Sequence, residues 1–229
     1  MSEEVRRMFA SISGRYDLLN SVLSLGVHHR WRKKTVRFSR AEQGMSVLDC
    51  ATGTGDLAIA YKKAVGASGQ VIGTDFCAEM MVTAPRKAGK RGLEIKWEVA
   101  DAMDLPYEDG KFDISTIAFG IRNVDDPVTA LSEMARVVRP NGKVVVLEFG
   151  QPYGVMKYPF HWHSKYFIPL VGGWLSGNRE AYQYLPDTSA AFPAGDRFLS
   201  LMKKTGRFKS FEYKPLMQGI AYIYVGTVL

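Results

Sequence analysis

Three acidic residues each follow a short apolar run, and a glycine-rich turn follows the first of them. Asp49 ends the run MSVLD, Asp75 ends QVIGTD, and Asp101 comes directly after EIKWEVA. The turn after Asp49 reads CATGTGD, with glycines at Gly53 and Gly55. Glycines let the backbone approach a ligand closely, and carboxylates accept hydrogen bonds from hydroxyl and ammonium groups. The pattern indicates a site for a nucleoside-like ligand.

Another polar pair follows a fourth apolar run, which reads KFDISTIAF. Arg122 and Asn123 come shortly after it, at the carboxyl end of a strand, where open α/β sheets bind their ligands. An arginine stays protonated and donates a planar fork, so Arg122 suits the stabilisation of negative charge on a reacting molecule. The alternative is that Arg122 pairs with Asp125 or Asp126 in a turn that starts the next helix.

Strand-like and helix-like runs alternate from Met45 to Phe149, and this alternation predicts a mostly parallel, doubly wound sheet. The segment 127–138 is expected to be helical, and KVVVLEF is expected to be the fifth strand. Two late strand-like runs, FKSFEYKPL and AYIYVGTVL, are joined by a short turn and predict an antiparallel edge. The first 40 residues form helical pieces separated by Gly14 and Gly26.

The composition is that of an ordinary globular protein, with 46% hydrophobic and 23% charged residues among 229. The net charge of +7 fits either an unspecialised basic surface or attraction to an anionic lipid, nucleic acid or small ligand. Cys50 and Cys77 lack a CxxC spacing, so neither a disulfide framework nor a metal centre is indicated. Neither a signal peptide nor a long apolar run is visible, and we expect a cytoplasmic protein.

Two classes of nucleotide ligand are compatible with the glycine turn. The segment 53–58 fits the loose dinucleotide fingerprint GxGxxG/A, and Asp75 stands where an acid binds a ribose diol. Asp101 and Ala102, however, resemble the adenine-contacting position of class I S-adenosylmethionine methyltransferases. S-adenosylmethionine carries cations and no phosphate, which suits carboxylates. Each acid alone is typical of a solvated strand end or a helix cap, but their order along the chain favours this ligand.

The expected fold is therefore the Rossmann-like α/β fold of class I S-adenosylmethionine-dependent methyltransferases. It has seven mostly parallel strands and an antiparallel last strand. We divide a single methyltransferase domain into an N-terminal helical segment (1–40), a cofactor-binding core (45–150), an aromatic cap insertion (151–192), and a C-terminal helix with two strands (193–229).

Three segments carry a closer resemblance: YDLLNSVLSLGVHHRWRKK (16–34), FGIRNV (119–124) and RVVRPNGKVVVLEF (136–149). They resemble the quinone-biosynthesis C-methyltransferases that make menaquinone and ubiquinone, and the terminal GIAYIYVG matches as well. The resemblance covers nearly the whole chain. The chain departs from the family pattern at Cys50-Ala51-Thr52 and at Ala118, where some members carry a hydroxyl.

The resemblance implies methyl transfer from S-adenosylmethionine to a ring carbon of a polyprenylated hydroquinone, with S-adenosylhomocysteine as the product. Demethylmenaquinol is the favoured acceptor, and the methoxybenzoquinol of ubiquinone synthesis is the alternative. By position, the family's cofactor contacts fall on Thr54, Asp75, Asp101 and Ala102, with Ala118 lining the pocket. The geometry of the turn adds Asp49, Gly53 and Gly55.

Four residues are candidates for the methyl transfer itself. Arg122 would stabilise a phenolate, and Asn123 would donate to the ring oxygen or hold a water. Tyr16 and Asp17 would form the other wall and orient the quinol, although a packing tyrosine and a helix cap are equally compatible with the sequence. The general base is not identified, and His28 or His29 could supply it. No metal is expected.

The aromatic residues of the predicted cap indicate where the prenyl tail of the acceptor would lie. Its Trp and Tyr residues suit an interface between oily and wet environments, and nearby Arg32, Lys33 and Lys34 would attract anionic lipid. Peripheral contact with the inner face of the membrane and a homodimer are both compatible with the sequence. The alternative is that the aromatics only pack the cap onto the sheet.

Two other classes of function are compatible with parts of the sequence. A nucleic-acid methyltransferase fits the positive charge, but FGIRNV stands where exocyclic-amine enzymes carry an Asp/Asn-Pro-Pro-aromatic turn. No nucleic-acid-binding module is visible, and we expect no nucleic-acid partner. A noncatalytic S-adenosylmethionine-binding scaffold of a quinone-synthesis complex is the second alternative, and the complete motifs argue against it.

Overall fold

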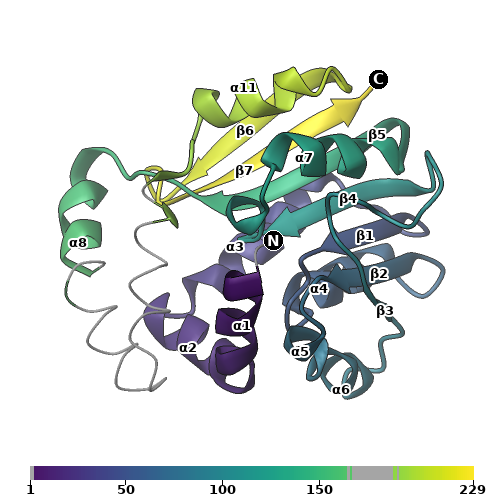
Figure 1. Ribbon diagram of the computed structural model, residues 1–229, viewed down its shortest axis with the longest axis horizontal. Coiled ribbons are helices and arrows are strands. Elements are labelled where there is room, and N and C mark those ends of the chain that lie inside the picture. The colour runs from purple at the N-terminus through teal and green to yellow at the C-terminus, as the bar shows by residue number, and fades with distance from the viewer. Residues whose placement is uncertain (1–2, 164–165, 167–187, 190) are drawn as a thin grey trace.

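A central sheet with helices on both faces forms the body of the molecule (Figure 1). The computed structural model describes residues 3–163, 166, 188–189 and 191–229. The aromatic residues predicted for the cap at Phe167, Trp174, Tyr182 and Tyr184 lie outside these described residues.

The sheet has seven strands in the order β3-β2-β1-β4-β5-β7-β6. Strands β1 to β5 pair in parallel, and β7 runs antiparallel between β5 and β6. The predicted antiparallel edge is therefore confirmed. The strands are β1 (Ser46–Cys50), β2 (Gln70–Asp75), β3 (Lys96–Val99), β4 (Phe112–Ala118), β5 (Val138–Phe149), β6 (Phe208–Leu216) and β7 (Ala221–Val228).

Two hydrophobic clusters, one on each face, hold helices against this sheet. Successive side chains of a strand point to opposite faces, so Val47 and Leu48 of β1 enter different clusters. Strands buried on both faces read as continuous apolar runs, which is why VVVL in β5 shows no alternation. Helices α7 and α11 cover one face, and α3 and α4 cover the other.

The helices follow the expected order. Those of the N-terminal part are α1 (Glu3–Ile12), η1 (Ser13–Arg15), α2 (Tyr16–Leu23) and α3 (Val27–Ser39). Those of the core are α4 (Asp56–Val65), α5 (Ala78–Met81), α6 (Ala84–Gly89), η2 (Ile121–Asn123) and α7 (Pro127–Arg136). Those that follow are η3 (Gly154–Met156), α8 (Lys157–Trp162) and α11 (Asp196–Lys204).

The boundary between α7 and β5 differs from the prediction. The helix was expected to run to Val138, but it ends at Arg136 and the strand begins at Val138. A proline at position 140 disfavours helix at the residue before it, so the chain extends early. The Asp126 carboxylate accepts a hydrogen bond from the Val128 amide (2.9 Å) and caps the start of α7.

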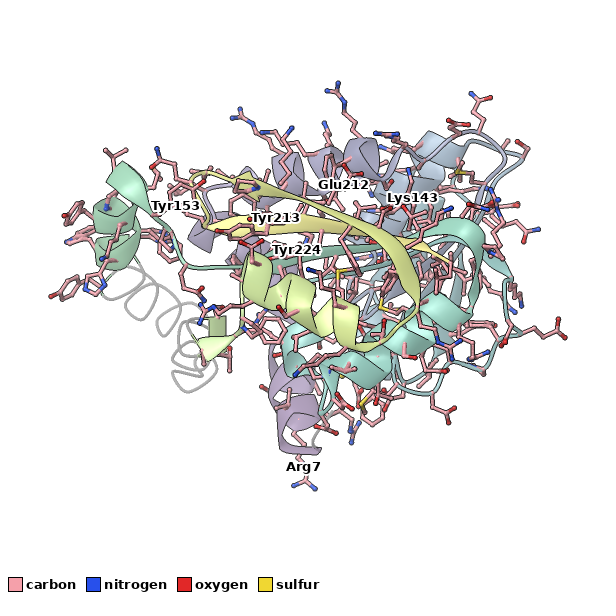
Figure 2. All side chains as sticks on the ribbon, turned by 90° about the horizontal axis from the view of Figure 1, so that it is seen from above. Arg7, Lys143, Tyr153, Glu212, Tyr213 and Tyr224 are labelled. Carbon is pink, nitrogen blue, oxygen red and sulfur yellow. The ribbon has the colours of Figure 1, made fainter. Side chains whose placement is uncertain are left out.

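The two late strands and α11 close the opposite edge of the sheet. Tyr213 of β6 and Tyr224 of β7 lie side by side there, with ring centroids 5.8 Å apart (Figure 2). The Tyr224 hydroxyl accepts a hydrogen bond from the Gly195 amide (2.7 Å), just before α11 begins. This contact ties the start of the C-terminal helix to the sheet.

Helix α1 lies next to α5, beside the carboxyl ends of β1 and β2, and α2 lies on the other side of α1 (Figure 1). Arg6 of α1 forms an ion pair with Glu79 of α5 at 3.3 Å. The N-terminal segment is thus placed over the glycine turn that the sequence singles out.

Candidate active site

The turn after β1 can form only because glycine occupies its last position. Gly55 has a φ of +81°, and a Cβ on it would lie 2.5 Å from the ring of Trp97. Gly53 also has a positive φ of +54°. Helix α4 begins at the next residue, Asp56, so the unpaired amides of its first turn lie beside the glycine turn.

Asp75, at the end of β2, holds the glycine turn in place. One of its carboxylate oxygens accepts a hydrogen bond from the Gly53 amide (2.8 Å), and the other accepts one from the Cys77 amide (2.9 Å). The residue is only 6% exposed, and this burial raises the pKa of its carboxyl. Asp75 therefore holds the shape of the glycine turn.

Asp49, at the end of β1, is a buried acid with an unusual affinity for its proton. It is 1% exposed and accepts a hydrogen bond from the Thr52 hydroxyl (2.6 Å). Desolvation raises the pKa of Asp49 to about 7, although the Thr52 hydroxyl and the charge of Arg32 oppose the shift. A cation placed beside this carboxyl would favour its ionised form.

We therefore expect the affinity for S-adenosylmethionine to rise by about tenfold between pH 6 and pH 8. Over this range an acid with a pKa of about 7 goes from mostly protonated to mostly ionised, and only the ionised form attracts the cationic ligand. Isothermal titration calorimetry across this range measures the effect.

The matched control for this pH dependence is Asp49→Asn. The amino group of the ligand itself titrates at about pH 8, so the variant supplies the baseline for that effect. The ratio of the two affinities should grow with pH. Parallel pH profiles for wild type and variant would show that Asp49 does not respond to the ligand.

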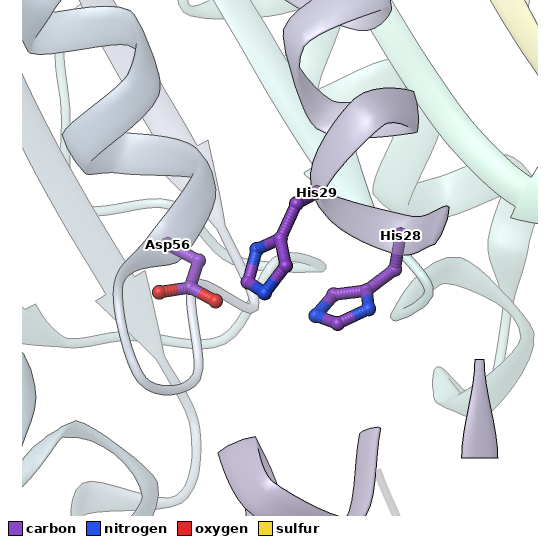
Figure 3. A group of neighbouring side chains, drawn as sticks. All are labelled: His28, His29 and Asp56. Atoms are coloured by element: carbon purple, nitrogen blue, oxygen red, sulfur yellow. The ribbon is translucent and has the colours of Figure 1, made fainter. Parts of the chain in front are cut away.

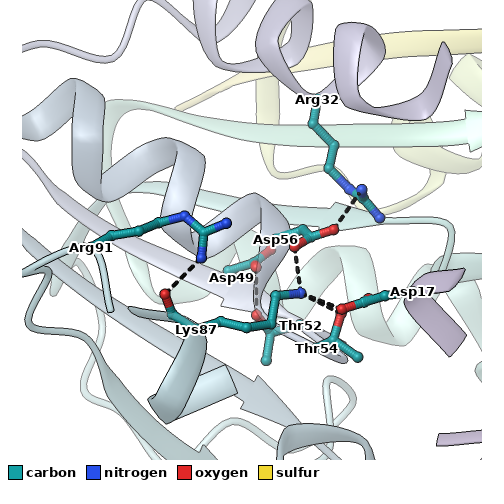
Figure 4. A network of polar contacts seen from close by, with 8 residues as sticks. All are labelled: Asp17, Arg32, Asp49, Thr52, Thr54, Asp56, Lys87 and Arg91. Carbon is teal, nitrogen blue, oxygen red and sulfur yellow. Dashed lines mark hydrogen bonds and ion pairs between the residues drawn. The ribbon is translucent and has the colours of Figure 1, made fainter. Parts of the chain in front are cut away.

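A network of polar side chains joins the N-terminal helices to the glycine turn (Figure 4). Asp17 of α2 accepts hydrogen bonds from the Thr54 hydroxyl (2.5 Å) and from the Lys87 ammonium group (2.6 Å). Lys87 also lies 2.5 Å from the Asp56 carboxylate, which Arg32 contacts on its other oxygen at 2.9 Å. The structure thus brings Asp17 to the cofactor turn.

Two cations of this network, Arg32 and Lys87, were not assigned to the site from the sequence. Arg32 was assigned to lipid attraction, but its guanidinium is bound to Asp56. Lys87 was not singled out, because nothing in the local sequence of α6 distinguishes it from the neighbouring Arg86 or Lys90. Only the packing of α6 beside α4 brings this lysine to the turn.

The remaining predicted cofactor contacts lie at the ends of β3 and β4. Asp101 follows β3 and accepts a hydrogen bond from the Met103 amide (2.9 Å), while Ala102 is buried. Ala118 is the last residue of β4 and is half-buried. These residues therefore line the same edge of the sheet as Asp49 and Asp75, since parallel strands end together.

The turn after β4 touches the glycine turn directly. A Cβ on Gly120 would lie 2.7 Å from the Cβ of Ala51, which begins the turn after β1. The short helix η2 follows and carries Arg122 and Asn123. The two polar features found in the sequence therefore lie next to each other.

Gly120→Ala is expected to destabilise the protein by about 1–3 kcal/mol, because the added methyl group overlaps Ala51 and must push the two turns apart. The measurement is thermal or urea unfolding. Gly89→Ala, at a position with open space around it, is the matched control and should leave the unfolding free energy nearly unchanged. Equal stability of both variants would contradict close contact between the turns.

Arg122 is a buried cation with a carboxylate partner. Its guanidinium lies 2.6 Å from the Glu148 carboxylate, and the two side chains are only 3% and 1% exposed. The same nitrogen of Arg122 donates to the Phe119 carbonyl (2.7 Å). The guanidinium therefore pairs with Glu148, and not with Asp125 or Asp126 as the alternative had it. Asp126 instead caps the start of α7.

Phe119 carries the strain of this turn. It has a positive φ of 56°, which is rare for an aromatic residue, and its ring lies 4.4 Å from that of Phe149. Its carbonyl accepts the hydrogen bond from Arg122 and a longer one from the Asn123 side chain (3.5 Å). Arg122 and Asn123 therefore both face the carbonyl of the residue that turns the chain.

Glu148 was missed by the sequence analysis, although a signal was available. It is the acid at the end of the fifth strand, inside the apolar run KVVVLEF. The same argument that selected Asp49, Asp75 and Asp101 from their strand ends applies to it. Among the predicted catalytic residues, Tyr16 begins α2, and its side chain lies outside the described part of the structure.

His28, His29 and Asp56 point toward one another across the space between α3 and α4 (Figure 3). Their ligand atoms lie within 4.8 Å of one another. Asp56, however, is already bound by Arg32 and Lys87, and these two cations would repel a metal ion. Burial lowers the pKa of His28 to about 4, so its imidazole is neutral at pH 7. We assign no metal to this group.

Comparison with known proteins agrees with this geometry. Residues 1–228 match the ubiE/COQ5 methyltransferase family. A ubiquinone/menaquinone biosynthesis C-methyltransferase UbiE of Bdellovibrio bacteriovorus is 55% identical over 99% of this chain and 96% of its own. A demethylmenaquinone methyltransferase of Deinococcus radiodurans is 44% identical over 98% of this chain and 92% of its own.

Solved structures support the fold alone. A SAM-dependent methyltransferase of Thermotoga maritima superposes with a TM-score of 0.68 at 19% identity, covering 96% of this chain and 98% of its own. One from Aquifex aeolicus gives a TM-score of 0.60 at 17% identity, covering 86% of this chain and 89% of its own. The class I methyltransferase fold expected from the sequence is confirmed.

Proposed function

Because the chain belongs to the ubiE/COQ5 methyltransferase family, we propose that it transfers a methyl group from S-adenosylmethionine to a ring carbon of demethylmenaquinol. The acceptor is a polyprenylated naphthoquinol, as the name of the Deinococcus relative suggests. The methoxybenzoquinol of ubiquinone synthesis is the second acceptor to be tested, since the Bdellovibrio relative is named for both quinones.

The residues at the carboxyl edge of the sheet fit S-adenosylmethionine. Asp75 would accept hydrogen bonds from the ribose diol, Asp101 and Ala102 would hold the adenine, and Asp49 would face the cationic end. The close packing around Gly55 leaves no room for a side chain there, and the positive φ of Gly53 favours glycine at that position as well. When bound, S-adenosylmethionine supplies a sulfonium methyl group for in-line attack by carbon.

One observation carries the proposal: the turn with Arg122 and Asn123 lies against the turn of the cofactor site, at the contact between Gly120 and Ala51. An acceptor bound beside Arg122 would therefore be held next to the transferable methyl group. The guanidinium would stabilise negative charge on the ring oxygen, and Asn123 would donate to the same oxygen. Such placement lowers the barrier because the reacting groups no longer need to find each other.

The test uses purified protein, labelled S-adenosylmethionine, and two short-tailed quinols kept reduced under nitrogen. Methylation of the naphthoquinol, with the product identified by mass spectrometry, is the expected result. Transfer only to the methoxybenzoquinol would change the acceptor. Cofactor binding without transfer to either quinol would contradict the proposed function and support a noncatalytic role.

Peripheral contact with an anionic lipid surface is a second part of the proposal. None of the described helices has the length and apolar composition that crossing a bilayer requires. Tyr158, Trp162 and Tyr166 follow one another at intervals of one helical turn and are 77%, 61% and 54% exposed. Aromatic residues favour the membrane interface, and Lys157 beside them adds positive charge.

Vesicle sedimentation tests this contact. We expect binding to phosphatidylglycerol-containing vesicles at low salt, and much weaker binding to phosphatidylcholine alone. The double variant Tyr158→Ala/Trp162→Ala should lose binding, whereas Val82→Ser, at an exposed apolar residue of another surface, should keep it. Equal binding of both variants would show that α8 is not the contact. Light scattering of the protein without vesicles tests whether it forms a homodimer.

A further inference from the structure

The proposed reaction needs a proton acceptor, and the residues first assigned to the site do not supply one. A neutral quinol carbon becomes strongly nucleophilic only when the neighbouring hydroxyl loses its proton. The Arg122 guanidinium stays protonated in proteins, and the Asn123 amide does not titrate. The acceptor side therefore lacks a base unless another side chain reaches it.

Glu148 meets Arg122 at the junction of β4 and β5. One of its oxygens is held by the Arg122 guanidinium (2.6 Å) and by the Phe149 amide (2.8 Å). The ring of Phe149 lies 5.4 Å from the centre of the same guanidinium. The pair is thus enclosed by aromatic and backbone groups, where an ion pair interacts more strongly than in water.

The pair is incompletely satisfied, and what it lacks is specific. Nε of Arg122 and the second carboxylate oxygen of Glu148 are both buried, and neither has a hydrogen-bond partner among the described residues. Leaving such atoms unpaired costs free energy, so they mark a site for a polar group. A hydroxyl complements them, because it accepts from a donor and donates to an acceptor at the same time.

We propose that Glu148 is the proton acceptor for the ring hydroxyl of the quinol, and that it works with Arg122 as one ionic unit. The hydroxyl would accept from Nε of Arg122 and donate to the free oxygen of Glu148. The inference rests on the proposed function, since it assigns a role within that reaction.

Proton transfer to Glu148 precedes methyl transfer in this scheme. The hydroxyl proton passes to Glu148, and the electron pair of the O–H bond stays on the ring oxygen as a phenolate. The neighbouring ring carbon then forms a bond to the methyl group as the methyl–sulfur bond breaks, and its electron pair passes to sulfur. The ring carbon afterwards loses its own proton to water, which restores the aromatic ring, and Glu148 returns its proton to the phenolate.

The proton transfer to Glu148 leaves the total charge of the enclosed group unchanged. Before proton transfer, Arg122 is neutralised by ionised Glu148; after it, Arg122 is neutralised by the phenolate. Moving a negative charge between two positions beside one cation avoids creating an unpaired charge in a buried site. Burial also raises the pKa of Glu148, which makes it a better base than an exposed carboxylate.

Other titratable groups near the site are engaged elsewhere. Asp49 faces the cofactor turn through Thr52, and Asp17 is bound to Thr54 and Lys87. The Nδ1 atom of His28 is hydrogen-bonded to Ser24 (2.5 Å). Tyr224 of β7 interacts with Glu148 electrostatically, and burial raises its own pKa, so it stays neutral in the working pH range.

The test compares the pH dependence of kcat for wild type and Glu148→Gln at saturating S-adenosylmethionine. Wild-type kcat should fall tenfold per pH unit on the acid side, as Glu148 becomes protonated. Glu148→Gln keeps the shape and a hydrogen-bond acceptor for Arg122, but it cannot take the proton. Its kcat should be about 10²–10⁴-fold lower and should show no such acid limb.

A control separates this role from a structural one. Glu133→Gln alters a different ion pair, with Arg136, whose two side chains are 22% and 21% exposed, and it should keep both kcat and the acid limb. If a buried water satisfies the two unpaired atoms instead, Glu148→Gln should keep the wild-type acid limb, and that result would overturn the inference. Failure of the proposed function is distinct, because the wild type itself would then methylate neither quinol.

Discussion

Asp75→Ala should weaken the binding of S-adenosylmethionine by roughly 100-fold, which corresponds to about 2.7 kcal/mol. The substitution removes the expected contact with the ribose diol and also the acceptor for the Gly53 and Cys77 amides. Each buried amide that loses its partner costs about 1–3 kcal/mol, so the glycine turn should lose its shape as well as its ligand. Calorimetric titration measures the affinity, and thermal unfolding measures the stability.

Asp113→Ala is the matched control for this variant. Asp113 also accepts a hydrogen bond from a backbone amide, that of Ser46 (2.7 Å), and it contacts Arg139 at 2.6 Å. It lies near the amino end of β4, whereas Asp75 lies at the carboxyl end of β2, so the two residues are at opposite ends of the parallel strands. Its loss should lower stability and leave cofactor affinity unchanged. An Asp75→Ala protein with wild-type affinity would reject the assignment.

Arg122→Lys should lower kcat by about 10²–10³-fold while cofactor affinity stays within a factor of two or so. The lysine keeps a positive charge, but it has no Nε–H to offer the ring hydroxyl, and its ammonium group is a point charge without the planar donors of the guanidinium. Single-turnover measurements of methyl transfer, together with calorimetric titration, separate the two effects. Arg136→Lys, which loses a two-nitrogen contact with the Glu133 carboxylate on α7, is the control and should keep its turnover.

The obvious variant, Arg122→Ala, would confuse catalysis with folding. It leaves Glu148 buried without its ion pair, and breaking a buried pair in this way costs about 3–5 kcal/mol. Arg122→Met/Glu148→Met removes both charges and should recover most of that stability. We expect this double variant to fold, to bind S-adenosylmethionine and to lack methyl transfer. Turnover at the wild-type rate in any Arg122 variant would exclude charge stabilisation by this residue.

Much of the fold could be predicted from local pattern. Apolar runs that end in an acid gave the positions of β1 and β2, and the late pair of strands gave the antiparallel edge. The end of α7 at Arg136 was harder to predict. The helical spacing of the preceding residues continues past it, but Pro140 disfavours helical backbone just after it.

The partners of the site residues were less accessible than their positions. Asp17 and Lys87 are 70 residues apart in the chain, and they meet only because α2 and α6 pack beside the same turn. Arg122 and Glu148 are 26 residues apart and meet because β4 and β5 are neighbours in the sheet. A charged side chain has several possible partners at such separations, and pattern alone does not choose among them.

The order of strands and helices, the glycine turn and the polar residues at the strand ends can be read from the amino-acid sequence. These features follow from local rules, since backbone freedom and the burial of apolar runs act over a few residues. The pairing of Arg122 with Glu148 and the contact of Asp17 with Thr54 depend on how distant segments pack in the folded chain. Burial and ion pairing depend on which elements pack together, and the pairing with Glu148 changes Arg122 from a free cation into half of an enclosed ion pair.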